Sequence, residues 1–182
     1  MVVHSCHPPV EGKSTSDKTT YSLEEFSSTR ESEILPPFDS DAIEFLDPMV
    51  PFHKISSSDI TNTPFLRHIA SKKKPVVLST GASTLSEIED AVEILYSNNY
   101  NNVILLQCIL NYPTKFSNAN LSMMNSLASA FPNCHIGLSD HTLADENMLV
   151  LTTAYAMGAR VIEKHYTFDK TIQGGDLSLI HI

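Results

Sequence analysis

The stretch VVLSTGASTLSEIEDAVEILYSNNYNNVILL, residues 76–106, decides the fold, because it contains a strand, a helix and the next strand in one unit. Its two apolar ends have the length and composition of buried strands. Ser83 or Thr84 can cap the helix, with Glu87 at the position of a capping box. Between the strands an apolar stripe recurs at helical spacing: Leu85, Ile88, Val92 and Leu95. Such a unit predicts parallel strands covered by a helix.

The same alternation continues along most of the chain. Further helical stretches are expected at 121–131 and 145–157. Repeated strand–helix units predict a parallel α/β fold, either an open doubly wound sheet or a barrel. The expected strands are 53–55, 76–78, 103–106, 135–138 and 160–162.

The N-terminal part differs from this pattern. Residues 1–33 are rich in Ser, Thr, Lys and Glu and show no sustained period, so they are expected to be irregular. Residues 34–46 look more ordered, with a Pro-Pro-Phe-Asp turn followed by a short helical stripe.

Composition excludes several classes of protein. The formal net charge is −9, and no basic stripe extends beyond Lys72-Lys73-Lys74, which argues against a nucleic-acid binder. The three cysteines have no metal-finger spacing and fit free thiols in a reducing compartment. We find no apolar run long enough for a membrane span and no signal-peptide core, so we expect a cytoplasmic protein.

Polar residues follow all five expected strands. In parallel α/β proteins, ligands bind at the carboxyl ends of the strands, so these residues predict a site. Individually, the Ser-Thr-Gly sequence also suits an ordinary turn, and the serine run suits a polar loop. The residues are Lys54, Ser56–Asp59, Ser79–Gly81, Asn111, Tyr112, Ser139–His141 and Glu163–His165.

His141 and His165 end two neighbouring runs and can share one divalent ion, since imidazole is the commonest catalytic metal ligand. A lone histidine is more often a hydrogen-bonding residue, but two at adjacent strand ends favour a site. Strand alternation places Glu163 and His165 on one face and Lys164 on the other. Lys54 and the serine hydroxyls can bind phosphate, so the pattern suits a phosphate-bearing substrate and an electrophile held on a metal.

Five motifs in this order resemble the sialic acid synthase family, which includes N-acetylneuraminate, legionaminate and pseudaminate synthases. The resemblance covers residues 34–176 and leaves 177–182 as an unmatched tail. The motifs are Lys54–Asn62, Leu78–Gly81, Asn111–Pro113, Ser139–Thr142 and Ile162–Thr167.

The resemblance implies a (β/α)8 TIM barrel that condenses phosphoenolpyruvate with an N-acetylated amino sugar aldehyde, giving a nonulosonic acid and phosphate. It implies Mn²⁺ or Mg²⁺ on His141 and His165. Asp59, where the family usually has Glu, is our candidate for managing protons, with Lys54 as a second catalytic residue. The implied substrate-binding residues are Lys54, Ser57, Ser79, Tyr112, Ser139 and Asp176.

The chain also departs from the family. The five strands match strands four to eight, Ile34–Asp39 is a degraded match to strand three, and strands one and two have no clear counterpart. The resemblance also implies a C-terminal domain, which we do not expect within these 182 residues, and a homodimer for the full-length protein. We therefore expect an incomplete barrel with low activity on its own. Two alternatives remain: a non-catalytic barrel remnant, or another phosphoenolpyruvate-dependent aldol synthase of the octulosonate type.

Overall fold

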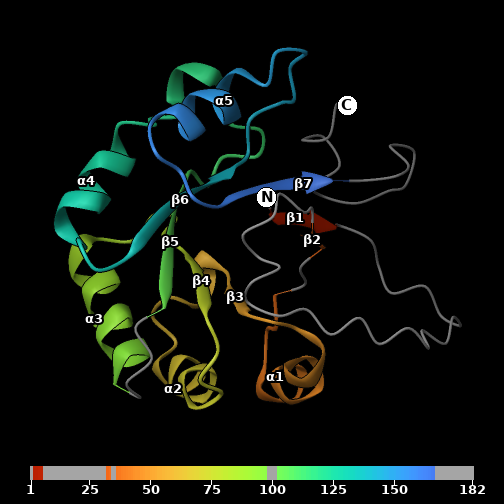
Figure 1. Cartoon of the computed structure of the whole chain (residues 1–182), viewed down its shortest axis with the longest axis vertical. Coiled ribbons are helices and arrows are strands. Elements are labelled where there is room, and N and C mark those ends of the chain that lie inside the picture. The colour runs from red at the N-terminus through yellow and green to blue at the C-terminus, as the bar shows by residue number, and fades with distance from the viewer. Residues whose placement is uncertain (1, 6–31, 34–35, 98–101, 167–182) are drawn as a thin grey trace, which may run out of the picture.

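The computed structural model of the chain describes residues 2–5, 32–33, 36–97 and 102–166. Seven parallel strands form one curled sheet in the order β2-β1-β7-β6-β5-β4-β3 (Figure 1). The strands are β1 (Val2–Ser5), β2 (Ser32–Glu33), β3 (His53–Ile55), β4 (Val76–Ser79), β5 (Val103–Cys108), β6 (His135–Asp140) and β7 (Ile162–Tyr166).

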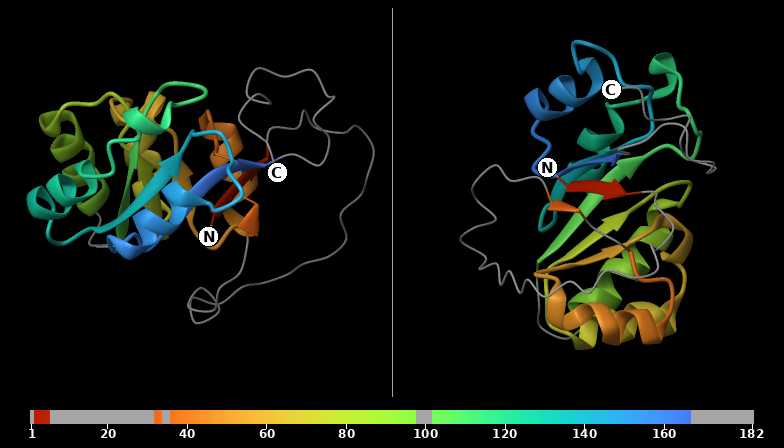
Figure 2. Two further views of the ribbon diagram at one scale, coloured as in Figure 1. Left: turned by 90° about the horizontal axis from the view of Figure 1, so that it is seen from above. Right: turned by 90° about the vertical axis from the view of Figure 1, so that its right-hand side faces the viewer.

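Five α-helices in the described part of the chain connect the strands and lie outside the curl (Figure 2). Short 3₁₀ turns η2 (Asp47–Met49), η3 (Ser57–Asp59) and η4 (Phe116–Asn118) complete the connections. The alternation of strand and helix from β3 to β7 confirms the expected parallel α/β fold. The helices are α1 (Ser40–Leu46), α2 (Thr63–Ser71), α3 (Leu85–Tyr96), α4 (Met123–Ala130) and α5 (Leu149–Ala156).

The last two elements differ from their expected bounds. Strand β7 begins at Ile162, two residues later than expected, and runs to Tyr166. Helix α5 begins at Leu149 rather than at Asp145, because the Asp145 carboxylate accepts hydrogen bonds from the N–H groups of Asn147 and Leu149. An aspartate that binds the backbone ahead of it favours a turn over continued helix.

The N-terminal segment corrects one expectation. Residues 1–33 were predicted to be irregular, yet strand β1 pairs in parallel with β7, and β2 pairs with β1. The red β1 lies beside the blue β7 in Figures 1 and 2. Strand β1 thus takes the place beside the last strand that the first strand of a closed barrel would have. Residues 6–31 lie outside the described part of the chain. The described strand order does not return from β3 to β2, so the described strands do not close a barrel.

Side chains alternate between two cores. The larger one fills the space between the sheet and its helices. The smaller one lies inside the curl, where Gly137 is required because a Cβ there would lie 2.2 Å from the carbonyl oxygen of Val161. This inner cluster consists of Phe52, Val77, Ile104, Leu106 and Val161.

Strands β3, β4, β6 and β7 continue past the inner cluster toward their carboxyl ends, where the inward positions are polar. The apolar cluster therefore closes the amino-terminal side of the barrel interior and leaves the other side for a site. No helix in the described ranges has both the length and the apolar character to cross a lipid bilayer.

Candidate functional site

Lys54 lies at the centre of the polar interior. Its ammonium donates hydrogen bonds to Ser79 Oγ and to the Ile55 carbonyl oxygen, both at 2.9 Å. The Glu163 carboxylate lies 3.3 Å away and accepts a 2.7 Å hydrogen bond from the Ser139 hydroxyl. These side chains come from strands β3, β4, β6 and β7. Because a buried ammonium needs anionic or hydrogen-bonding partners, this contact set stabilises the positive charge at the carboxyl ends of the strands.

Ser57 joins this group through a tight turn. Gly81 has a φ of +52°, and a Cβ at this position would lie 2.5 Å from the Ser57 Cβ. The buried Cys108 lies next to Gly81 and Ser57 at this turn. Burial raises the pKa of the Cys108 thiol, so it stays neutral beside Lys54. Glycine is therefore needed where the turns after β3 and β4 meet.

The two predicted metal ligands lie close together. The ring centroids of His141 and His165 are 5.3 Å apart. The ring of Tyr112 lies against both, with centroid distances of 4.0 Å to His141 and 5.7 Å to His165. The three rings thus form one aromatic group where β6, β7 and the turn after β5 meet.

His141 is held in the form that a metal ion requires. Its Nδ1 lies 2.7 Å from the carbonyl oxygen of Ile109, which can only accept, so Nδ1 carries the proton and Nε2 has a free lone pair. Burial lowers the pKa of the His141 imidazole and favours the neutral ring. A backbone carbonyl that fixes the tautomer is the usual outer contact of a metal-binding histidine.

The imidazoles of His141 and His165 suit a divalent ion whose other coordination positions are filled by water or substrate. The described residues contain no group of three or more histidine, cysteine or acidic ligands. Two imidazoles are therefore the protein ligands that this part of the chain can offer, and water or substrate oxygens must complete the coordination.

Among the predicted residues that the structure describes, most come together and Asp59 does not. Lys54, Ser79 and Ser139 share one contact network, while Ser57 lies at its edge. Asp59 lies in η3, where its carboxylate accepts a hydrogen bond from the Ser58 hydroxyl at 3.2 Å; in the described structure no contact joins it to Lys54 or to either histidine. Asp176 lies outside the described residues, as do 177–182.

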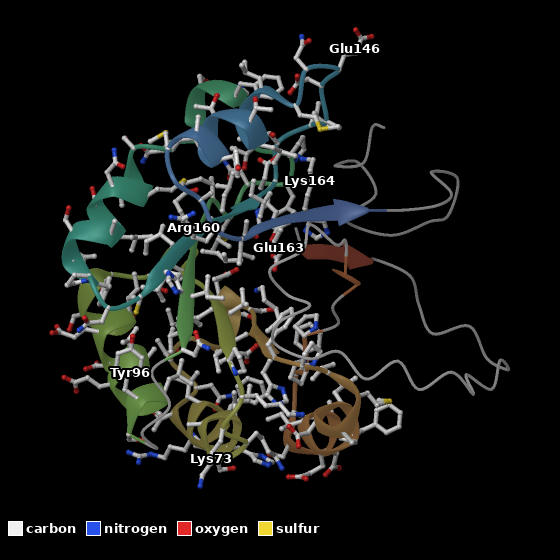
Figure 3. The ribbon with its side chains drawn as sticks, viewed as in Figure 1. Lys73, Tyr96, Glu146, Arg160, Glu163 and Lys164 are labelled. Carbon is white, nitrogen blue, oxygen red and sulfur yellow. The ribbon has the colours of Figure 1, made fainter. Side chains whose placement is uncertain are left out.

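The sequence did not reveal two features of the site. Cys108, which the sequence identified only as one of three free thiols, is buried and borders Ser57 and Gly81. Counting alternate positions along β5 from Leu106 would have placed it on the inner face. The second feature is the contact set of Lys164 on the outer face of β7, where its ammonium binds Asp140 and the carbonyl oxygen of Thr142. The direction of the side chain itself follows from alternation, and Figure 3 shows Glu163 and Lys164 on opposite sides of the strand.

Comparison with known proteins gives the same assignment. Residues 11–179 match the NeuB family, a match that starts upstream of the motifs first recognised. The chain is 41% identical over 167 residues to N,N'-diacetyllegionaminic acid synthase of Legionella pneumophila, covering 88% of this chain and 46% of that protein. It is 36% identical over 141 residues to pseudaminic acid synthase of Helicobacter pylori, covering 77% and 40%.

A solved structure is also similar. The crystal structure of N-acetylneuraminic acid (sialic acid) synthetase from Leptospira borgpetersenii, in complex with citrate, has a TM-score of 0.72 and 38% sequence identity, and covers 82% of this chain and 50% of that one. The chain spans less than half the length of the two curated relatives above. The curled sheet is part of a TIM barrel, and the chain belongs to the NeuB family, the family of the sialic acid synthases.

Proposed function

We propose that this chain carries the phosphoenolpyruvate site and the metal site of a nonulosonic acid synthase. The reaction would condense phosphoenolpyruvate with an N-acetylated amino sugar aldehyde and release phosphate. The observation that carries the proposal is the buried Lys54, with its hydroxyl partners, in the same barrel mouth as the paired imidazoles of His141 and His165.

The Lys54 network suits a small polyanion. The ammonium supplies positive charge, and the hydroxyls of Ser57, Ser79 and Ser139 can turn their protons toward phosphate or carboxylate oxygens. An entering anion would take over the role that Glu163 has in the structure, which is to balance Lys54. The Leptospira relative was solved with citrate, which is itself a polyanion.

The histidine pair suits the aldehyde partner. His141 and His165 would hold Mn²⁺ or Mg²⁺, which when bound supplies Lewis-acid polarisation of a carbonyl. Their own contribution is to present two imidazole nitrogens, and the Ile109 carbonyl oxygen fixes the tautomer of His141. Tyr112 packs on both rings and restricts the space in which a sugar can lie.

In the proposed reaction, the enol carbon of phosphoenolpyruvate forms a bond to the aldehyde carbon of the sugar. Water then adds at the phosphate-bearing carbon, and phosphate leaves by carbon–oxygen cleavage. Lys54 would hold the anionic end of phosphoenolpyruvate throughout, which fixes the direction of attack. Proton transfer by Asp59 and a sugar contact from Asp176 stay predictions, as do a homodimeric full-length protein and a cytoplasmic location.

The first test measures binding as well as turnover, because an incomplete barrel is expected to release phosphate slowly. Mn²⁺ and phosphoenolpyruvate binding are followed by calorimetry, and phosphate release is followed with N-acetylmannosamine present. We expect Ser79→Ala to weaken phosphoenolpyruvate binding about tenfold, the value of a lost hydrogen bond to a charged group. His141→Ala and His165→Ala should abolish Mn²⁺ binding.

Ser86→Ala, on the exposed face of α3, is the matched control and should bind both ligands normally. If the unaltered chain bound neither Mn²⁺ nor phosphoenolpyruvate, the proposal would fail and the chain would be a non-catalytic barrel remnant.

A further inference from the structure

Lys164 lies between Glu163 and His165 in β7 but faces the outside of the sheet (Figure 3). Its ammonium donates a 2.7 Å hydrogen bond to Asp140 Oδ2 and another 2.7 Å hydrogen bond to the carbonyl oxygen of Thr142. Asp140 and Thr142 are the residues on either side of His141. Lys164, the residue before His165, therefore binds the residues on both sides of His141.

The sheet itself stops short of the two histidines. The pairing of β6 with β7 runs through Ser139↔Glu163 and ends at Asp140↔Lys164. His141 and His165 would form the next pair, but the ladder does not reach them. Backbone hydrogen bonds between the two strands therefore do not set the distance between the two imidazoles, and Lys164 supplies the connection at this point.

Asp140 is a rigid attachment for Lys164. Its side chain is buried, and its carboxylate also accepts hydrogen bonds from the Thr142 N–H at 2.9 Å and the Thr142 hydroxyl at 3.0 Å. These contacts close a tight turn around His141. On the other side, the His141 carbonyl oxygen accepts a hydrogen bond from the Thr114 N–H at 2.8 Å. The turn is therefore fixed to the segment after β5, and Lys164 fixes it to β7.

We propose that Lys164 is a positioning residue that sets the separation of His141 and His165 through Asp140 and Thr142. The inference rests on the proposed metal site and adds the group that preorganises it. An ion bound by two protein ligands is sensitive to their spacing, since it has few other protein bonds to compensate for a shift. The ammonium acts from outside the barrel and does not touch substrate.

Electrostatics and positioning predict opposite results when Lys164 is removed. Loss of a positive charge near a cation site should strengthen Mn²⁺ binding by Coulomb's law. Loss of the bridge to Asp140 and Thr142 should weaken it, by about tenfold as for other outer contacts of metal ligands. We expect Lys164→Met to weaken Mn²⁺ binding despite the favourable change in charge.

The measurement is a Mn²⁺ titration at about pH 8, above the ordinary histidine pKa of about 6.5, so that proton competition is small. Lys73→Met removes the same charge from an exposed turn after α2 and serves as the matched control. Lys164→Gln keeps one hydrogen-bond donor and should fall between the unaltered protein and Lys164→Met. It also serves as the test variant if Lys164→Met does not fold in a metal-free thermal melt.

The outcomes separate the two proposals. If the unaltered protein, His141→Ala and His165→Ala bound Mn²⁺ with equal affinity, the proposed metal site itself would be wrong. Loss of Mn²⁺ binding in the histidine variants would support the metal site. If Mn²⁺ binding were then unchanged or tighter in Lys164→Met and Lys164→Gln, the proposed role of Lys164 would be overturned. Weaker binding in both Lys164 variants, with normal binding in Lys73→Met, supports it.

Discussion

His53 and Lys54 are neighbours in β3, and strand alternation sends their side chains to opposite sides of the sheet. Lys54 enters the polar interior, whereas the buried His53 places Nε2 2.9 Å from Asp47 Oδ1 on the outer side. Lys74 binds the same carboxylate oxygen at 3.1 Å. His53 Nδ1 is buried without a hydrogen-bond partner in the described structure. A protonated His53 would therefore add charge to a site that can bind only one of its two N–H groups.

The stability of the protein should depend on this histidine below neutral pH. Burial lowers the pKa of His53 below its usual 6.5, and Asp47 only partly opposes the shift. The unfolded chain therefore binds more protons as the pH falls through 6.5, so the free energy of unfolding decreases there and is fully recovered above that pH.

Urea denaturation of the unaltered protein and of His53→Gln, measured from mildly acidic to neutral pH, checks this expectation. As the pH falls, the free energy of unfolding of the unaltered protein should decrease more than that of His53→Gln. A constant difference across the range would contradict the expected role of His53. Because His141 is also buried with a lowered pKa, the comparison must use this difference and not the unaltered protein alone.

At the scale of the element, α3 shows how local sequence places the site. The Thr84 hydroxyl accepts a hydrogen bond from the Glu87 N–H at 3.3 Å, and the Glu87 carboxylate accepts one from the Thr84 N–H at 2.7 Å. This confirms the predicted capping box and selects Thr84 over Ser83. The short turn that precedes α3 brings Gly81 against Ser57.

Thr84→Ala should lower the free energy of unfolding by about 1 kcal/mol, the usual value of a helix N-cap. Ser83→Ala removes a hydroxyl one residue earlier, outside the capping box, and should leave stability nearly unchanged. Chemical denaturation of both variants measures the difference. Equal losses in the two variants would show that the cap does not stabilise α3.

At the scale of the whole molecule, the barrel interior has two halves. The apolar cluster around Leu106 closes one side, and the Lys54 network occupies the other. The apolar cluster excludes water from the amino-terminal side of the barrel interior. The contacts of Lys54 with Ser79 and Glu163 are therefore stronger, because charges interact more strongly in a medium of low dielectric constant.

Leu106→Ala should destabilise the fold by about 3 kcal/mol, because the side chain is completely buried and its loss leaves a cavity. Leu85→Ala is the control, since Leu85 is 53% exposed and should cost much less. Urea unfolding gives both values. A similar cost for the two substitutions would mean that the inner cluster is loosely packed.

Much of this protein could be predicted from local sequence. Strands β3 to β7, the cap of α3 and the inward direction of Glu163 follow from hydrophobic periodicity and side-chain hydrogen bonding, which act over a few residues. The metal-ligand assignment of His141 and His165 and the expected family also came from motifs at strand ends. The family is confirmed, whereas the metal assignment stays a prediction.

Only the tertiary structure decided the remaining features. The pairing of β1 with β7, the contact of Lys54 with Glu163 and the bonds from Lys164 to both sides of His141 join residues far apart in the chain. No local pattern encodes such contacts, because they depend on how the sheet curls and on which strand ends meet. The sequence therefore determined which chemical groups the strands carry, and the curl of the sheet determined which of them can act together.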